Sequence, residues 1–223
     1  MSDDELFGIN SKYKIVSGSI SLCDKNCVNQ FVGLFGKNEQ EVVFFYNLYF
    51  SRYHILHELG HIIRDYLKIE CNFISKGASE EHIVNLFAVK YLQYIQDYEY
   101  LQSLEIMINH LLFLNNISVD FNISQMDKNF SELCKDIRLY GALQFSSIKN
   151  SMTNPIDFLS LVSLMTNNKI TLINSSIVFS KKKTGSELIS ECLELVFGLV
   201  EKKPEINFEL NSDISIQKAF KIS

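Results

Sequence analysis

The sequence contains no tryptophan, only two prolines and only nine glycines among its 223 residues. So few breaking and flexible residues leave little room for low-complexity linkers. Hydrophobic residues at 47% and charged residues at 21% are ordinary for a folded globular protein and exclude an intrinsically disordered chain. A chain of this length suits one large domain, or a compact core with a smaller appended one.

Basic residues are also in short supply. Lysine and arginine total 21 against 26 acidic residues, which gives a formal net charge of -5. A nucleic-acid-binding domain normally shows a basic footprint, so we expect no direct nucleic-acid partner. No stretch reaches the ~18 apolar residues that a membrane-spanning helix needs, so we expect no membrane partner either.

A secretory leader and a disulfide framework are the other expected absences. The first residues, MSDDELFGIN, are acidic and contain no apolar segment of the kind that a signal peptide needs. The five cysteines are an odd number without the spacing of a disulfide scaffold. Both observations predict a protein of the reducing cytoplasm.

The hydrophobic pattern predicts strands near the N-terminus and helices through the rest of the chain. Residues 12–22 and 41–50 are rich in β-branched and aromatic side chains, which favours strands. Residues 52–67 and 79–98 carry apolar side chains at helical spacing. We therefore expect an α+β fold, in which a small N-terminal β-sheet packs on this pair of helices and a mostly helical C-terminal half follows.

The run RYHILHELGHIIRDY, residues 52–66, contains the spacing H-E-x-x-H. Its histidines are His57 and His61, and its glutamate is Glu58. Residues four apart lie on one face of a helix, so the two imidazoles can bind one metal ion, for which Zn²⁺ is the usual choice. Glu58 lies beside them and can take a proton from a water whose pKa the metal lowers to about 7.

A catalytic zinc site needs a third protein ligand and an open position for water and substrate. Glu80 and Glu81 both lie at the start of the next predicted helix, and Asn85 one turn later can orient a ligating histidine. The alternative is an ordinary core helix. A chance H-E-x-x-H in such a chain is roughly a 1-in-100 event. An unpaired buried carboxylate also costs several kcal/mol, so we favour the metal site.

Other residues of the same region have less specific interpretations. His54 lies on the same predicted helix as His57 and His61, and the start of a helix has the wrong curvature to bring three histidines to one ion. We therefore expect His54 to lie outside the metal site, with an extra pocket group as the alternative. We expect His82 and His110 to lie outside the site as well. Gly60 costs a helix about 1 kcal/mol relative to alanine. We expect it where another backbone passes close, such as a strand beneath the helix.

Two motifs together resemble the ImmA/IrrE family of zinc metallopeptidases. Family members show a strand leading into R-(F/Y)-x-(I/L)-x-H-E-(L/I)-G-H, and a later helix of the form E-x-x-A-N-x-F-A-x-x-L-L. The first motif is matched by Arg52, Tyr53, Ile55, His57, Glu58, Leu59, Gly60 and His61. The second is matched by Glu81, Asn85, Phe87, Ala88 and Leu92. Val84 replaces the usual small alanine and Tyr91 replaces an aliphatic residue. The resemblance covers roughly residues 12–95.

The resemblance implies a metallo-endopeptidase with a gluzincin-type zinc site. It implies zinc ligation by His57, His61 and Glu81, with Glu58 as the general base. Glu80 is the alternative ligand if the helix register differs by one residue. We expect residues 1–98 to form the zincin-like core. Residues 99–223 match no family module that we recognise and would dock substrate, regulate the enzyme or complete its core.

Two further questions stay open at this stage. Such enzymes usually supply an additional donor for the developing oxyanion. The candidates by residue type are Tyr91, Tyr94, Tyr140 and His110. The resemblance implies a protein substrate such as a helix-turn-helix transcriptional repressor. The alternatives are a zinc-binding interaction module that sequesters a partner without cleaving it, and an effector or toxin protease that acts on a host protein.

Overall fold

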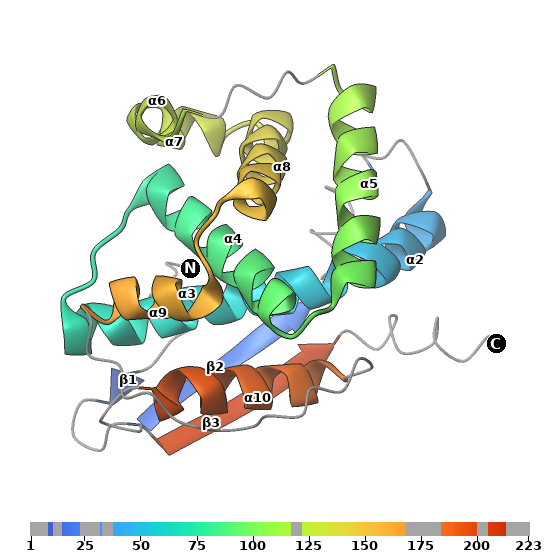
Figure 1. Cartoon of the computed structure of the whole chain (residues 1–223). Coiled ribbons are helices and arrows are strands. Elements are labelled where there is room, and N and C mark those ends of the chain that lie inside the picture. Colours follow the sequence, from blue (N-terminus) through green and yellow to red (C-terminus); the bar gives the residue numbers. More distant parts are fainter. Residues whose placement is uncertain are drawn as a thin grey trace.

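The computed structural model describes residues 9–10, 15–22, 32, 38–116, 122–167, 184–199 and 205–212, and helices dominate them (Figure 1). The helices are α2 (Glu39–Tyr49), α3 (Ser51–Cys71), α4 (Gly77–Tyr94), α5 (Tyr98–Leu114), α6 (Ile123–Lys128), α7 (Phe130–Leu133), α8 (Ile137–Thr153), α9 (Phe158–Met165) and α10 (Gly185–Gly198). The strands are β1 (Ile9–Asn10), β2 (Ile15–Leu22) and β3 (Glu205–Ser212). None of these helices is both long enough and apolar enough to cross a membrane.

The expected α+β fold with an N-terminal sheet is wrong, because the fold is mostly helical. The strand predicted for residues 41–50 belongs to α2, which begins with a capping box. Asn38 Oδ1 accepts a hydrogen bond from Glu41 N at 3.0 Å, and Glu41 Oε2 accepts one from Asn38 N at 3.2 Å. This local signal, with Val42 and Tyr46 buried on one face, outweighs the strand preference of the valine and aromatic side chains.

The small sheet joins segments that are far apart in the sequence. Its central strand is β2, which pairs antiparallel with β1 and parallel with β3. The parallel register runs from Ile15 opposite Glu205 to Leu22 opposite Ser212. A strand does lie within the segment 12–22, but its longest partner comes from after α10 and not from the N-terminal region.

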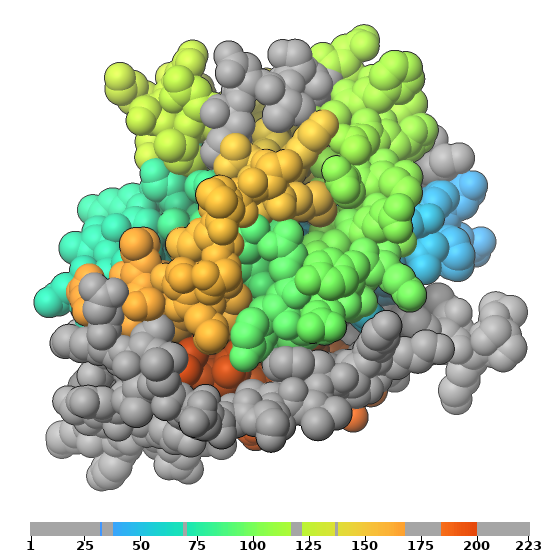
Figure 2. Space-filling model, in the orientation of Figure 1, coloured from blue at the N-terminus to red at the C-terminus, as the bar shows by residue number. Residues whose placement is uncertain are grey.

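Helix α4 lies at the centre of the helical core. It packs against α3 on one side and against α8 on the other, with α5, α6 and α9 also in contact. Figure 2 shows the side chains of α8 filling the space between α4 and α5. One buried cluster extends from Val42 on α2 to Leu199 after α10. The helices beyond residue 98 therefore complete the core around α3 and α4.

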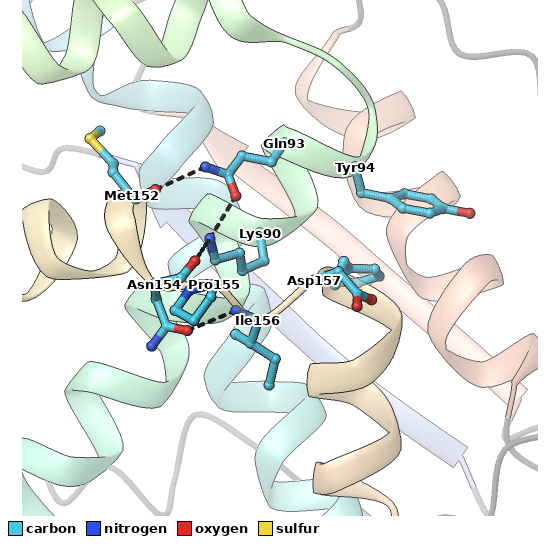
Figure 3. Close-up of a pocket in the computed structure, with 9 residues that line it drawn as sticks. Lys90, Gln93, Tyr94, Met152, Asn154, Pro155, Ile156 and Asp157 are labelled. Carbon is cyan, nitrogen blue, oxygen red and sulfur yellow. Dashed lines mark hydrogen bonds between the residues drawn. The ribbon is translucent and has the colours of Figure 1, made fainter.

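A hollow of about 310 Å³ lies where the C-terminal end of α4 meets the segment between α8 and α9 (Figure 3). Lys90 lies at this hollow and is only 3% exposed. Its Nζ donates to Gln93 Oε1 and to the Asn154 carbonyl oxygen, both at 2.7 Å. Asn154 is the C-cap of α8, so Lys90 satisfies a carbonyl at the end of that helix. Burial lowers the pKa of Lys90.

Candidate metal centre

Gly60 allows α3 to approach α4 closely. A Cβ placed on Gly60 would lie 3.0 Å from Val84 Cβ and 3.3 Å from Val84 Cα. The expected close approach is confirmed, but the neighbour is helix α4 and not a strand. The contact brings the face of α3 that carries His57 and His61 opposite Glu81 on α4.

The side chains of His57, His61 and Glu81 converge. Each offers one ligand atom, and these atoms all lie within 4.8 Å of one another. His57 Nε2 is 3.5 Å from Glu81 Oε2, and His61 Nε2 is 3.8 Å from Glu81 Oε1. Ligands about 2.0–2.1 Å from a tetrahedral ion are themselves about 3.3 Å apart, so small shifts would bring these atoms to one ion. The donor set fits a divalent metal without being specific to zinc.

The outer ring nitrogen of His57 is held by Asn85. His57 Nδ1 lies 2.7 Å from Asn85 Oδ1, to which the Tyr53 hydroxyl also donates. Asn85 Nδ2 donates to Gln144 Oε1 at 2.8 Å and to Ser147 Oγ at 2.9 Å, so its Oδ1 is the atom that accepts from His57. This leaves His57 Nε2 to face the metal centre. Burial lowers the pKa of His57, which favours the neutral imidazole that binds metals.

The outer ring nitrogen of His61 is held by Glu80. Glu80 Oε1 lies 3.1 Å from His61 Nδ1 and also accepts a hydrogen bond from Arg64 Nη2. Burial opposes the ionised form of Glu80, but the hydrogen bond from His61 and the charge of Arg64 outweigh it and lower its pKa. The sequence did not decide whether Glu80 or Glu81 is the third ligand. In the structure Glu81 belongs to the converging cluster, whereas Glu80 contacts the outer ring nitrogen of His61.

Glu58 lies beside the cluster with its side chain 32% exposed, and His54 holds it. His54 Nε2 is 3.0 Å from Glu58 Oε1, and the Tyr46 hydroxyl is hydrogen-bonded to His54 Nδ1. Burial would raise the pKa of Glu58, but the hydrogen bond from His54 and the charges of the neighbouring histidines lower it to about 2. The carboxylate is therefore ionised at neutral pH. His54, which we expected to lie outside the site, is in contact with its glutamate.

Helix α8 adds two residues to the site that the sequence did not identify as a pair. Gln144 Nε2 donates to Glu81 Oε2 at 2.5 Å and to the Tyr140 hydroxyl at 2.8 Å. Burial and the negative charge of Glu81 both raise the pKa of Tyr140. The other three candidates for an oxyanion donor lie elsewhere: Tyr91 is buried in the core, Tyr94 lines the hollow beside Lys90, and His110 is exposed on α5. The only sequence signal for the pair is its i, i+4 spacing in the apolar run LYGALQF.

The two ends of the helix pair are anchored by residues from other helices. The start of α3 is tied to Asp97 through Arg52 Nη1, at 2.5 Å from Asp97 Oδ2. The first turn of α4 has no side-chain cap of its own. Asp127 of α6 supplies one: its Oδ1 accepts from Ser79 N at 2.8 Å, and the Ser79 hydroxyl donates to Oδ2. This contact holds the turn that carries Glu81.

Comparison of the chain with protein families, curated proteins and solved structures finds no match. The resemblance to the ImmA/IrrE family therefore stays a prediction from two motifs. Among the described residues, His57, His61 and Glu81 are the histidine, cysteine and acidic side chains whose ligand atoms converge.

Proposed function

We propose that this protein is a zinc-dependent metallo-endopeptidase that hydrolyses a specific protein substrate. The observation that supports the proposal most strongly is the convergence of His57 Nε2, His61 Nε2 and the Glu81 carboxylate, with an ionised glutamate beside them. A core helix would need no such convergence. The two histidines also have their outer nitrogens held, as expected of metal ligands.

In this proposal each side chain of the centre has one role. His57, His61 and Glu81 hold the ion, while Asn85 and Glu80 fix the two imidazoles. A bound zinc ion would supply Lewis-acid activation of water and of the scissile carbonyl. Glu58 accepts the proton of the attacking water and later passes it to the leaving amine.

Tyr140 is the donor that we propose for the developing oxyanion. Its hydroxyl lies beside Gln144, which itself contacts Glu81, so the phenol is at the edge of the centre. Its raised pKa keeps the hydroxyl protonated at neutral pH, as a hydrogen-bond donor requires.

The substrate proposal depends on the family resemblance. We propose a cytoplasmic protein substrate, such as a helix-turn-helix repressor, and no direct nucleic-acid or membrane partner. The resemblance implies a strand before the first motif, and α2 takes its place. The way in which this chain holds its substrate therefore need not follow the family.

The experiment compares new protein N-termini, by mass spectrometry, in cells that produce the wild type or Glu58→Gln. The variant removes the base and keeps the three ligands, so zinc content measured on both purified proteins is the matched control. We expect equal zinc and a set of termini that appear only with the wild type. Full zinc occupancy without any new termini would contradict the peptidase and favour a zinc-binding module that sequesters its partner.

A further inference from the structure

We propose that His54 is a positioning residue for Glu58: its Nε2–H group holds one carboxylate oxygen and leaves the other free to accept the proton from water. This inference rests on the proposed role of Glu58 as the general base. The motif that residues 52–61 resemble leaves position 54 unspecified. His54 is therefore a feature of this chain and not part of the family pattern.

The hydrogen bond to Glu58 fixes where the proton of His54 lies. An ionised carboxylate can only accept hydrogen bonds, so the ring nitrogen 3.0 Å from Glu58 Oε1 must carry a proton. In a neutral His54, Nδ1 is then the unprotonated nitrogen and acts as an acceptor.

Tyr46 supplies the donor that this tautomer needs. Its hydroxyl is hydrogen-bonded to His54 Nδ1, and its ring meets the imidazole edge-on, with centroids 5.7 Å apart and planes at 82°. Tyr46 is 1% exposed on α2, so the phenol is fixed by packing. Two hydrogen bonds therefore connect Tyr46 in the core, through His54, to the partly exposed carboxylate of Glu58.

The arrangement matters because a general base must be within hydrogen-bond reach of the proton it takes. Glu58 is the most exposed acidic side chain of the centre, with 32% of its side chain accessible against 12% for Glu81 and 20% for Glu80. A free side chain at that exposure would sample several rotamers. The N–H group of His54 restrains one carboxylate oxygen of Glu58 and leaves the other oxygen free to face the water.

The first test uses the purified protein labelled with ¹⁵N-histidine, and its NMR readout does not depend on activity. Two-bond ¹H–¹⁵N NMR correlations report which ring nitrogen of each histidine is protonated. We expect His54, assigned by its loss in His54→Gln, to be the Nε2–H tautomer. We expect Tyr46→Phe to shift His54 toward a mixture of its Nδ1–H and Nε2–H tautomers. Exposed His110 is the internal control and should not change. A His54 ring that is protonated on Nδ1 alone, or that behaves like His110, would overturn the proposal.

The second test uses the substrate found by N-terminal mapping. We expect His54→Ala to lower kcat by roughly 10–100-fold, the usual range for such an outer partner, with KM and zinc content unchanged. We expect His54→Gln to restore part of kcat, because its amide N–H can reach the same oxygen. His110→Gln is the matched control, since His110 is exposed on α5. An unchanged kcat in His54→Ala would overturn the inference. If the wild type cleaves nothing, the proposed function fails and the NMR result alone decides the position of Glu58.

Discussion

Helix α4 carries a buried or nearly buried charged side chain toward each end, and the two differ in what surrounds them. Lys90 donates to two neutral oxygens, one of which belongs to the end of α8 (Figure 3). Glu81 faces the Nε2 atoms of two histidines whose other ring nitrogens are already occupied. The first group completes a helix end, whereas the second leaves ligand atoms directed at a common point.

The comparison shows that burial of a polar group does not by itself indicate function. Both Lys90 and His57 are pushed by burial toward the neutral form, and their pKa values are lowered for the same reason. What distinguishes the candidate metal centre is that the Nδ1 atoms of its two histidines are hydrogen-bonded while their Nε2 atoms converge on Glu81. Variants at the two ends should therefore separate metal affinity from stability.

The largest expected effect is on zinc affinity at the Glu81 end. We expect Glu81→Ala to lose more than the roughly 10–100-fold that removal of an outer hydrogen-bond partner costs, because it deletes a ligand atom. Glu80→Ala should lose an amount within that range. Titration against a chromogenic chelator measures both. Full zinc stoichiometry in Glu81→Ala, together with loss in Glu80→Ala, would exchange the two roles.

Gly60→Ala should have the next largest effect, and it should lower both the free energy of unfolding and the zinc affinity. The helix gains about 1 kcal/mol in propensity, but a contact of 3.0 Å with Val84 Cβ must be relieved at a cost of about 1–3 kcal/mol. We expect a net loss of about 1 kcal/mol in urea unfolding and weaker zinc binding, since the helices are pushed apart. A more stable protein with unchanged zinc affinity would show that the contact between α3 and α4 accommodates the added methyl group without strain.

Lys90→Met tests the other end of α4. We expect a loss of about 1 kcal/mol in the free energy of unfolding, because the Asn154 carbonyl loses its donor. Zinc affinity should stay at the wild-type value. A clear fall in zinc affinity would mean that the two ends of α4 are coupled, and the contrast between them would no longer hold.

The smallest effect is expected for Asp127→Ala, because the helix cap that it removes is exposed and should lie at the low end of the ~0.5–2 kcal/mol that such caps contribute. Zinc affinity should also fall slightly, because the capped turn carries Glu81. Asp157→Ala is the matched control: Asp157 caps α9 by accepting from Ser160 N at 2.9 Å, away from the metal centre. We expect the control to lose stability in urea unfolding and to keep its zinc affinity in the chelator titration. Equal zinc affinities in both variants would show that α4 keeps its first turn without Asp127.

Long amphipathic helices are the part of this fold that could be predicted from the sequence. Segments 52–67 and 79–98 lie largely within α3 and α4, because each buries a broad apolar face that fixes its period. Helix α2 could not be found by composition, since its side chains favour strands and only the capping box at Asn38 indicates a helix. Missing α2 also concealed Tyr46, the partner of His54.

The H-E-x-x-H spacing was enough to bring His57 and His61 together, because both lie on one face of one helix. Choosing between Glu80 and Glu81 was not possible from spacing, because the choice depends on how α4 is rotated against α3. The role of Gln144 was even harder to predict from the sequence. Its contact with Glu81 joins residues 63 positions apart, and nothing local in the sequence indicates that α8 packs there.

The parallel pairing of β2 with β3 sets an order of events during synthesis. Residues 15–22 leave the ribosome early, but their partners at 205–212 follow all of the helices described. Pairing over such a separation must wait for a long loop to close, whereas the contacts between α3 and α4 are nearly local. We therefore expect the helical core to form first and β2 to keep one edge unpaired until residues 205–212 have been synthesised. That interval is when the nascent chain is most exposed to pairing with other strands.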